Sequence, residues 1–514
     1  MPGLTDYYTN ILGHNAAAIR YIDEDFVGGR RTNGSVYSFA FGDPVIPVSL
    51  TGTKQTVRIV GGRADGEEVA CKAPLPLRAT PVLHFAMVDV QQGDGMYFFT
   101  PGGRIILIDG GDNQLFARHL AARFSGTTSS KRLLIDGMIV THGDADHFDG
   151  LAEIRRSETL QNTPAEPNRE RKRLFIQVDR IFHNGLVKRP EKRPDGTKRK
   201  KTEMFGATVP AVPDINADAF CTELVENLLI DVAETELNRP FKNWRSAVAH
   251  WNSHRAITMQ RVDQLQSQDI KNLFQQEADF GIDVHGPIAQ MVANKPRLPF
   301  LREPVKVTEM HLSDEPAVNR SFSDSHTING HSITLRLRYK NVRFLLTGDL
   351  NQQAMARLRA ALPGTDFECE ILKAPHHGSH DFDFAMLQQA KPVVSLISSG
   401  DESELHEHIH PRATLVSALG RVSRGKTGVI FMTELAAFFK VRGLAKPVDP
   451  PAAPAFFAFE RTNFGIVHIR TDGARVLAFT HSGEQGVNEG YTFDVNAANG
   501  VTWRETLATR TAPA

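Results

Sequence analysis

The ten residues at 141–150, THGDADHFDG, constrain this chain more than any other segment. They follow an apolar, strand-like stretch at 133–140, and within six residues they place four potential metal ligands: His142, Asp144, Asp146 and His147. Successive side chains at a strand end point in different directions, so they can face two neighbouring ions. Imidazole and carboxylate groups together suit zinc, manganese or iron. A solvated, inert polar loop is the alternative, but this density of ligand-type residues favours a metal centre.

Composition narrows the classes of protein. The 514 residues include 59 Lys or Arg and 59 Asp or Glu, so no overall field marks a polyanionic partner. Three cysteines, Cys71, Cys221 and Cys369, form no close pair and predict neither a disulfide framework nor a cysteine-based zinc site. The N-terminus lacks a leader pattern, and no run approaches the roughly 18–20 apolar residues that cross a bilayer. We expect a cytoplasmic protein without membrane association.

Strand-like runs and glycine turns predict the domain organisation. Residues 1–80 contain short β-type pieces and are expected to form a small β-rich accessory unit. From residue 81 to about 480, apolar runs alternate with turns and helical patterns, which indicates an α/β layered domain. A hairpin is expected around Asp472-Gly473, and residues 481–514 are assigned to a C-terminal extension.

Residues 155–279 interrupt that alternation and predict a largely helical insertion. Leucine, valine and aromatic residues at helical spacing predict amphipathic helices at 217–232 and 245–275. We interpret these helices as a cap on the core.

The insertion contains a basic loop at 186–201, with eight Lys or Arg against Glu191 and Asp195, a net charge of +6 (8 − 2). Proline and glycine within it predict an exposed, mobile segment. One interpretation is electrostatic contact with substrate phosphates. The residues proposed for this contact are Lys198, Arg199, Lys200 and Lys201. The equally weighted alternative is a solvated loop that only aids solubility.

Further ligand-type residues end two later strand-like runs. Asp349 follows the apolar run at 344–348, and His376 and His377 follow the run at 371–375. A layered α/β fold collects such side chains at strand ends, so they are expected to join the 142–147 motif.

An ordered series of motifs extends over most of the chain, from residue 83 to about 480. It consists of DVQQGD at 89–94, IDGG at 108–111, the 142–147 motif, GHS at 330–332, LTGD at 346–349, PHHGS at 375–379 and HP at 410–411. As a set these motifs resemble the metallo-β-lactamase superfamily, and within it most closely the hydrolase domain of bacterial DNA-uptake (ComEC-type competence) proteins and its stand-alone relatives. The resemblance implies an αββα sandwich, with the N-terminal unit and the insertion outside it.

The resemblance also implies two divalent metal ions, zinc or manganese. The ligands carried over are His142 and Asp144 for one ion, Asp146 and His147 for the second, Asp349 as the bridge, and one of His376 and His377 to complete the second site. We prefer His376 of that pair. Asp144 stands where superfamily hydrolases generally have histidine; this matches the DNA-uptake group and favours manganese relative to zinc.

His331 departs from the DNA-uptake group, which tends to have an amide at this place. Hydrolytic superfamily members have a ligand histidine there, so His331 is interpreted as a restored ligand of the first ion. The alternative is a histidine that caps a turn at the start of a strand.

Four other positions receive roles by the same resemblance. Asp109 would orient a ligand histidine by accepting its other ring proton. His410 would contact substrate phosphate or protonate a leaving group, and Ser379 would donate a hydrogen bond to phosphate. The alternatives are a passive, exposed His410 and an ordinary turn serine. The Gly110-Gly111 pair is attributed to tight backbone geometry rather than to phosphate binding.

The resulting functional expectation is a metal-dependent hydrolase that attacks phosphodiester bonds in DNA or RNA with a metal-bound hydroxide. Asp146 would position that hydroxide or take its proton. A small-molecule phosphodiesterase or another ester or amide hydrolase of the superfamily is one alternative, and a non-catalytic, metal-stabilised binding or regulatory protein is another. Nucleic acid is the expected substrate, and action beside partner proteins is a further possibility.

Overall fold

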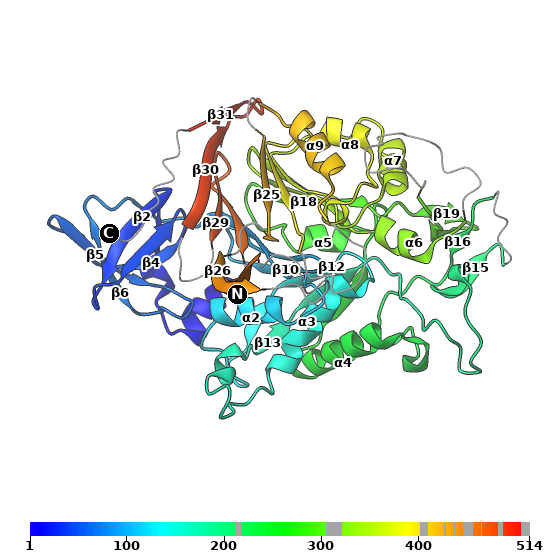
Figure 1. Ribbon diagram of the computed structural model, residues 1–514, viewed down its shortest axis with the longest axis horizontal. Helices are drawn as coiled ribbons and strands as arrows, with labels where there is room; N and C mark the ends of the chain where they lie inside the picture. Colours follow the sequence, from blue (N-terminus) through cyan, green and yellow to red (C-terminus); the bar gives the residue numbers. More distant parts are fainter. Residues whose placement is uncertain are drawn as a thin grey trace.

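The structure, a computed structural model, describes residues 1–211, 217–304, 321–400, 410–425, 428–434, 438–445, 456–463, 465–481 and 487–504. Two β-sheets form its centre, and helices cover their outer faces (Figure 1). The expected α/β class is confirmed at this level.

The larger sheet has ten strands among the described residues, and four of them, β10, β12, β14 and β17, run parallel. In sheet order the strands are β17 (Thr258–Arg261), β14 (Arg180–His183), β12 (Gly137–Val140), β10 (Ile105–Asp109), β9 (Gly95–Phe99), β8 (Leu83–Val88), β28 (Ile466–Thr471), β29 (Arg475–His481), β30 (Val487–Val495) and β31 (Val501–Trp503). From β10 to β31 each neighbouring pair is antiparallel.

The second sheet has six strands among the described residues. In sheet order they are β18 (Phe280–Gly286), β21 (Thr334–Tyr339), β22 (Val342–Leu346), β23 (Ile371–Lys373), β24 (Val394–Ile397) and β25 (Val429–Met432). The last four run parallel, and antiparallel pairing joins β18, β21 and β22.

A continuous apolar core separates the two sheets. Side chains alternate between the faces of a strand, so Leu83, Phe85 and Met87 of β8 point into this core. Across the interface, the ring of Phe85 lies 5.6 Å from that of Phe344 on β22. The intervening residues of the same strands point outward, and both sheets therefore bury both faces.

Helices cover the outer faces of the sheets. The larger sheet carries α2 (Leu115–Arg123), α3 (Ala145–Ser157) and α4 (Arg239–His254), and the second sheet carries α7 (Gln352–Ala361), α8 (Phe384–Ala390) and α9 (Ala413–Val422). Shorter helices are α1 (Gly3–Asp6), α5 (Gln268–Asn272) and α6 (Asp324–Gly330). The layers thus follow the order helix, sheet, sheet, helix.

A separate seven-stranded antiparallel sheet lies within the first 80 residues, at one end of the molecule (Figure 1). Its strands are β1 (Arg20–Ile22), β2 (Phe26–Arg31), β3 (Val36–Ala40), β4 (Pro44–Ser49), β5 (Lys54–Ile59), β6 (Glu68–Lys72) and β7 (Leu77–Arg78). It has a small apolar core of its own. Arg470 of β28 ties it to the larger sheet by donating to the carbonyls of Ala40 and Phe41.

The segment 155–279 differs from the expected helical insertion. β14 and β17 lie within it and form one edge of the larger sheet. The expected helix at 217–232 is wrong for the described residues, which contain the short strand β16 (Phe220–Cys221) and turns. The expected helix at 245–275 is confirmed only up to His254, where α4 ends. The strand β17 and the short helix α5 follow.

Small sheets complete the insertion and its surroundings. β11 (Leu133–Ile135) pairs with β13 (Ile176–Val178), and β15 (Thr208–Val209), β16, β20 (Lys295–Pro299) and β19 (Gln290–Val292) form a four-stranded sheet near α6. β26 (Phe438–Ala445) pairs with β27 (Phe456–Asn463).

The C-terminal region extends the larger sheet. The expected hairpin around Asp472-Gly473 is confirmed as β28 and β29. β30 and β31 continue the same sheet past residue 480, where a C-terminal extension was expected to begin. None of the helices in the described part of the chain combines the length and apolar character needed to cross a bilayer.

Candidate metal centre

The candidate site lies where the carboxyl ends of parallel strands from both sheets meet. β10 and β12 end beside it in the larger sheet, and β22 and β23 end beside it in the second sheet. In open α/β sheets, ligand sites form outside the carboxyl ends of strands. The loops after these strands carry the ligand-type side chains that the sequence analysis singled out.

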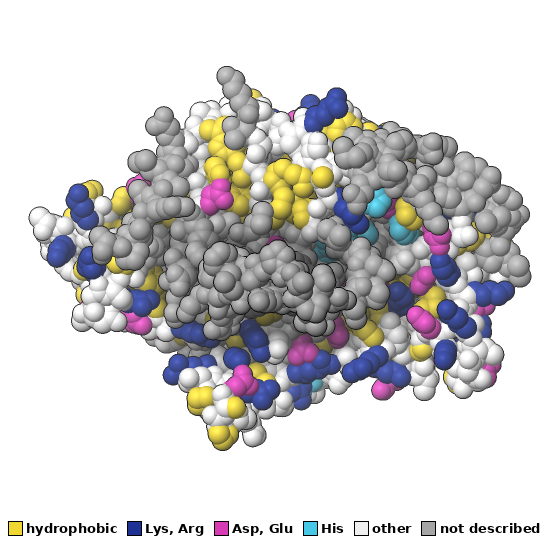
Figure 2. Space-filling view, viewed as in Figure 1, with side chains coloured by type: hydrophobic (Ala, Val, Ile, Leu, Met, Phe, Trp, Pro, Cys, Tyr) yellow, Lys and Arg dark blue, Asp and Glu magenta, His cyan; other side chains and the backbone are white. Residues whose placement is uncertain are grey.

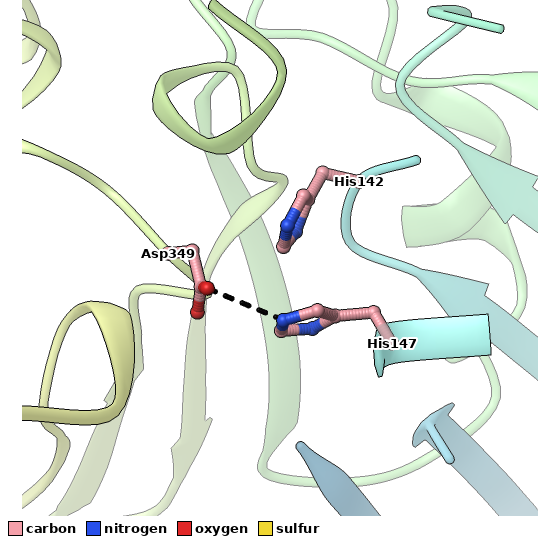
Figure 3. A group of neighbouring side chains, drawn as sticks. All are labelled: His142, His147 and Asp349. Carbon is pink, nitrogen blue, oxygen red and sulfur yellow. Dashed lines mark ion pairs between the residues drawn. The ribbon is translucent and has the colours of Figure 1, made fainter. Parts of the chain in front are cut away.

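His142, His147 and Asp349 converge from three elements (Figure 3). His142 follows β12, His147 lies in the first turn of α3, and Asp349 follows β22. The two imidazole rings are 4.0 Å apart between centroids, and all three side chains are buried.

A second group also contains His147 and has more ligand-type side chains around one point. It contains Asp146, His147 and His377, and Asp349 faces the same point. His377 Nε2 lies 2.9 Å from Asp349 Oδ2 and 3.6 Å from Asp146 Oδ2. His147 Nε2 lies 3.3 Å from Asp349 Oδ2 and 4.0 Å from Asp146 Oδ1. Ligand atoms bound tetrahedrally at about 2.1 Å would be about 3.4 Å apart, so these four side chains fit one divalent ion. We call them the four-ligand group.

Asp109 fixes the orientation of His147. Its Oδ2 lies 2.9 Å from His147 Nδ1, and both groups are fully buried. Thr141 holds the carboxylate in place, because its backbone N–H and its hydroxyl donate to the two oxygens at 2.8 and 2.6 Å. His147 therefore presents only Nε2 to the centre, which agrees with the orienting role expected for Asp109.

Charges in the site keep the Asp349 carboxylate ionised. Burial opposes the charged form of Asp349. The surrounding cationic groups, of which His377 has the largest effect, outweigh burial and hold the pKa of Asp349 well below its usual range. Burial likewise opposes charge on His377, yet Asp349 outweighs it and raises the pKa of His377 to about 10. Burial lowers the pKa of His142 well below its ordinary value, so this ring is neutral. A metal ion bound to Asp349 and His377 would therefore take the place of the His377 proton.

Unpartnered buried nitrogens provide the test of whether a metal fits. His147 Nε2 and His377 Nε2 are buried and lack a hydrogen-bond partner of acceptable geometry among the described residues. A buried polar atom without a partner is costly, and an ion would satisfy both. Two imidazoles and two carboxylates suit zinc or manganese. The residues present therefore fit a divalent ion.

The side of the centre expected to hold the first ion is less complete. His142 and Asp349 face it, but Asp144 Oδ1 lies 3.3 Å from Lys188 Nζ. With its amide oriented to satisfy all its contacts, Asn329 donates to Asp144 Oδ2 at 2.8 Å and accepts from His376 Nε2 at 3.3 Å. Asp144 thus has both oxygens engaged by the protein.

The expectation that His331 is a restored ligand does not match its geometry. His331 Nε2 lies 2.7 Å from the carbonyl oxygen of Pro299, and the ring lines a separate cavity of about 300 Å³ with Leu350 and Arg357. Burial lowers the pKa of His331 to about 4. The ring is in none of the groups of neighbouring ligand-type side chains among the described residues, and its contact with Pro299 is that of a buried structural histidine.

His377, not the preferred His376, faces the four-ligand group. His376 Nε2 lies 3.9 Å from Asp349 Oδ2 and contacts Asn329 instead. Both residues have positive φ angles, 46° and 50°, and this tight turn after β23 aims the two rings in different directions. The choice depends on a backbone conformation that is rare for side-chain-bearing residues.

A buried lysine, which the sequence analysis did not identify, supports the site from behind. Lys373, at the end of β23, forms an ion pair with Asp94 and lies 3.5 Å from Asp349 Oδ1; both Lys373 and Asp94 are fully buried. It also donates to the carbonyl of Gly348 at 2.8 Å. Asp94 in turn lies 3.4 Å from His377 Nδ1, so one lysine positions two carboxylates. A charged residue inside an apolar strand was the available signal.

Two glycines allow the loops to approach each other. A Cβ atom on Gly93, whose φ is 94°, would lie 1.6 Å from the carbonyl oxygen of Asp146. A Cβ atom on Gly110 would lie 2.8 Å from the backbone nitrogen of Leu151 in α3. The close packing at Gly110 agrees with the backbone role expected for the Gly110-Gly111 pair.

The basic loop is more ordered and less available than expected. Arg189 and Arg199 both pair with Glu236, Arg193 pairs with Glu203, and Lys201 pairs with Glu303. Of the residues proposed to contact phosphate, Arg199 and Lys201 are thus engaged. Lys192, Lys198 and Lys200 are exposed without an ion-pair partner among the described residues.

The two remaining expected residues lie near the centre. The ring centroid of His410 is 5.9 Å from that of His376. Ser379 is buried, and its hydroxyl accepts a hydrogen bond from the backbone N–H of Asp381 at 3.2 Å. That contact serves the local turn.

No protein-family model matches the chain, and a search of curated proteins finds no match.

Proposed function

We propose that the protein is a metal-dependent hydrolase with a metallo-β-lactamase-type αββα sandwich, and that it cleaves phosphodiester bonds in DNA or RNA. The observation that carries the proposal is the four-ligand group, Asp146, His147, His377 and Asp349, at the carboxyl ends of strands from two facing sheets. The helix–sheet–sheet–helix order and the series of motifs in the sequence support the same superfamily.

Divalent ions bound here would lower the pKa of a water molecule and neutralise charge on the substrate phosphate. The protein's own groups supply the other requirements. Asp146 is the most exposed member of the four-ligand group, with 23% of its side chain accessible. Gln92 donates to its Oδ2 at 3.2 Å. Asp146 is therefore placed to accept the proton of an entering water, while Asp109 and Lys373 hold their neighbours rigidly behind it.

A cation at the edge of the centre favours a phosphate substrate. The side chain of Lys188 is 23% accessible. Its Nζ lies 3.3 Å from Asp144 Oδ1 and 3.8 Å from Asp324 Oδ2. A phosphodiester carries one negative charge, and it would compete with Asp144 and Asp324 for this partly exposed ammonium. Esters without charge would gain nothing from this lysine.

A small phosphodiester is the second candidate substrate. Five of the eight cations of the basic loop are held in ion pairs, which leaves few free charges to follow a long phosphate backbone. This pairing favours a compact substrate over lengthy double-stranded DNA.

The test is hydrolysis of four substrates by purified protein with manganese or zinc: single-stranded DNA, double-stranded DNA, RNA and bis(4-nitrophenyl) phosphate. The Asp146→Ala variant is the inactive control, and His331→Gln is the matched control because that histidine lies outside the centre. Metal-dependent polymer cleavage that is lost only in Asp146→Ala supports a nuclease. Turnover of the small ester alone supports the second candidate, and no turnover of any substrate overturns the proposal.

A further inference from the structure

A histidine–aspartate pair lies outside the four-ligand group, at the edge of the centre. His326 Nε2 is 2.9 Å from Asp381 Oδ2, and the two side chains are 20% and 10% accessible. Ser379 fixes the acidic partner, because its hydroxyl accepts from the backbone N–H of Asp381. The other ring nitrogen of His326, Nδ1, has no hydrogen-bond partner among the described residues.

Helix α6 brings this pair close to the centre. Residues three apart lie on the same face of a helix, so His326 is about one turn, roughly 5 Å along the axis, from Asn329, which touches both Asp144 and His376. Asn351, two residues after Asp349, donates to the backbone carbonyl of His326 at 2.8 Å. α6 is therefore tied to the loop that carries the shared carboxylate.

Figure 2 shows histidine side chains gathered at one place on the face that it draws, next to basic and acidic side chains. Burial opposes charge on Asp381, but the hydrogen bond from His326 outweighs it and lowers the pKa of Asp381. An ionised carboxylate that accepts from Nε2 holds the ring in one orientation, as in other acid–histidine pairs.

Cleavage of a phosphodiester needs such a donor. The bond from phosphorus to the leaving oxygen breaks with its electron pair on that oxygen, and an alkoxide is a poor leaving group unless it receives a proton. A carboxylate or imidazole bound to a metal ion through its ligand atom has no proton to give at that atom, so the four-ligand group does not supply one.

We propose that His326, oriented by Asp381, is the general acid that protonates the leaving oxygen. This inference rests on the proposed function. Water oxygen forms a bond to phosphorus and its proton passes to Asp146; the bond to the leaving oxygen breaks, and that oxygen takes the proton from His326 Nδ1. Asp146 then releases its proton to solvent and His326 takes one from solvent. The products are a phosphate monoester and an alcohol.

The test compares two diesters of thymidine that differ in the leaving group. The 4-nitrophenyl ester of thymidine 5′-phosphate releases a stabilised phenolate that needs no proton, whereas the dinucleotide thymidylyl-thymidine releases an alkoxide. The variants are His326→Gln and Asp381→Asn, with His380→Gln as the matched control because it removes a neighbouring imidazole from the same segment. Bound manganese is measured in each variant.

We expect His326→Gln to lower kcat for the dinucleotide by about 100-fold and to change kcat for the nitrophenyl ester by less than about threefold. Asp381→Asn should follow the same pattern with a smaller loss, and His380→Gln should change neither. Equal losses on both diesters, no loss on either, or a wild-type protein that hydrolyses only the nitrophenyl ester would each overturn the inference while leaving the metal-dependent activity established. A wild-type protein inactive on both would overturn the proposed function itself.

Discussion

The Nδ1 atom of His147 lies 2.9 Å from Asp109 Oδ2, and this contact leaves Nε2 as the only ring nitrogen that can face an ion. One nitrogen binds one ion. His147 can therefore be a ligand either in the four-ligand group or in the group of His142, His147 and Asp349, but not in both. If two ions bind, one takes the four-ligand group and the other depends on His142, Asp349 and Asp144.

Replacement of Asp109 by asparagine should weaken metal binding. The amide can donate as well as accept, so it no longer enforces the Nδ1–H tautomer of His147, and loss of such a partner typically costs about 10–100-fold in metal affinity. Competition with a chromophoric chelator measures the change. Asp136→Asn is the control, because Asp136 is a buried acid that accepts from Gly3 and Ile105. Similar losses in both variants would contradict the orienting role.

Metal titration should resolve two classes of site of unequal strength. The four-ligand group has four side chains that face one point. At the weaker site, an ion can bind Asp144 only by displacing its ion pair with Lys188. Lys188→Met should therefore tighten the weaker class by about tenfold, because a cation next to the ion is removed, and leave the tighter class unchanged. Lys198→Met, from the same basic loop, should alter neither. A weaker class that does not respond to Lys188→Met would refute this assignment.

Gly93→Ala should disturb the centre through Asp146. A Cβ atom there would overlap the carbonyl oxygen of Asp146, and the residue has φ 94°. Gly196 also has positive φ, 83°, but a Cβ atom on it meets no atom of the described part of the chain within 4 Å. Both alanine variants should lose about 1 kcal/mol of unfolding free energy from backbone strain, and only Gly93→Ala should lose metal-dependent activity and further stability, about 1–3 kcal/mol in all. Urea unfolding and manganese affinity, measured on both, separate the two effects.

His331 should make the stability of the protein sensitive to acid. Its pKa falls from 6.5 to about 4 on folding because the ring is buried. The unfolded chain therefore binds a proton between these values that the folded protein does not, so this residue's contribution is present above pH 6.5 and is lost as the pH falls. When the pH is lowered from 7 to 5, the free energy of unfolding should fall in both proteins. The fall should be about 2 kcal/mol smaller in His331→Gln than in the wild type. The measurement is the urea midpoint of each protein at both pH values. An equal change in midpoint for the two proteins would show that His331 is not a buried neutral group.

The sequence predicted the strand ends of the site better than the directions of its side chains. Apolar runs mark β12 and β22 clearly, so His142 and Asp349 could be placed at their carboxyl ends. The choice of His377 over His376 depends on a turn with positive φ angles. The direction of His331 depends on the carbonyl of Pro299, 32 residues away. Neither leaves a local pattern in the sequence.

Long-range pairing hid the buried lysine from sequence reasoning. Lys373 and Asp94 are far apart in the chain: Lys373 ends β23 of the second sheet, and Asp94 immediately precedes β9 of the larger sheet. A lysine in a short apolar run is an anomaly, but only the fold shows which carboxylate satisfies it.

The missing helix at 217–232 has a local cause. Asp231 accepts from the backbone N–H groups of Glu226 and Asn227 at 2.9 and 2.7 Å, and the Asn227 side chain accepts from Leu229. Such side-chain contacts satisfy backbone donors without a helix. Apolar spacing alone therefore overstated the helical content, and in the same region pairing with β14 converted part of the second expected helix into β17.

The most direct test of the proposed metal centre is a crystal structure of the protein grown with manganese, with the ion located by its anomalous scattering. We predict a peak within about 2.0–2.2 Å of His147 Nε2 and His377 Nε2, with Asp146 and Asp349 as the oxygen ligands. The His147→Ala protein should show no peak there. A wild-type crystal with saturating manganese and no peak among these four side chains would contradict the account.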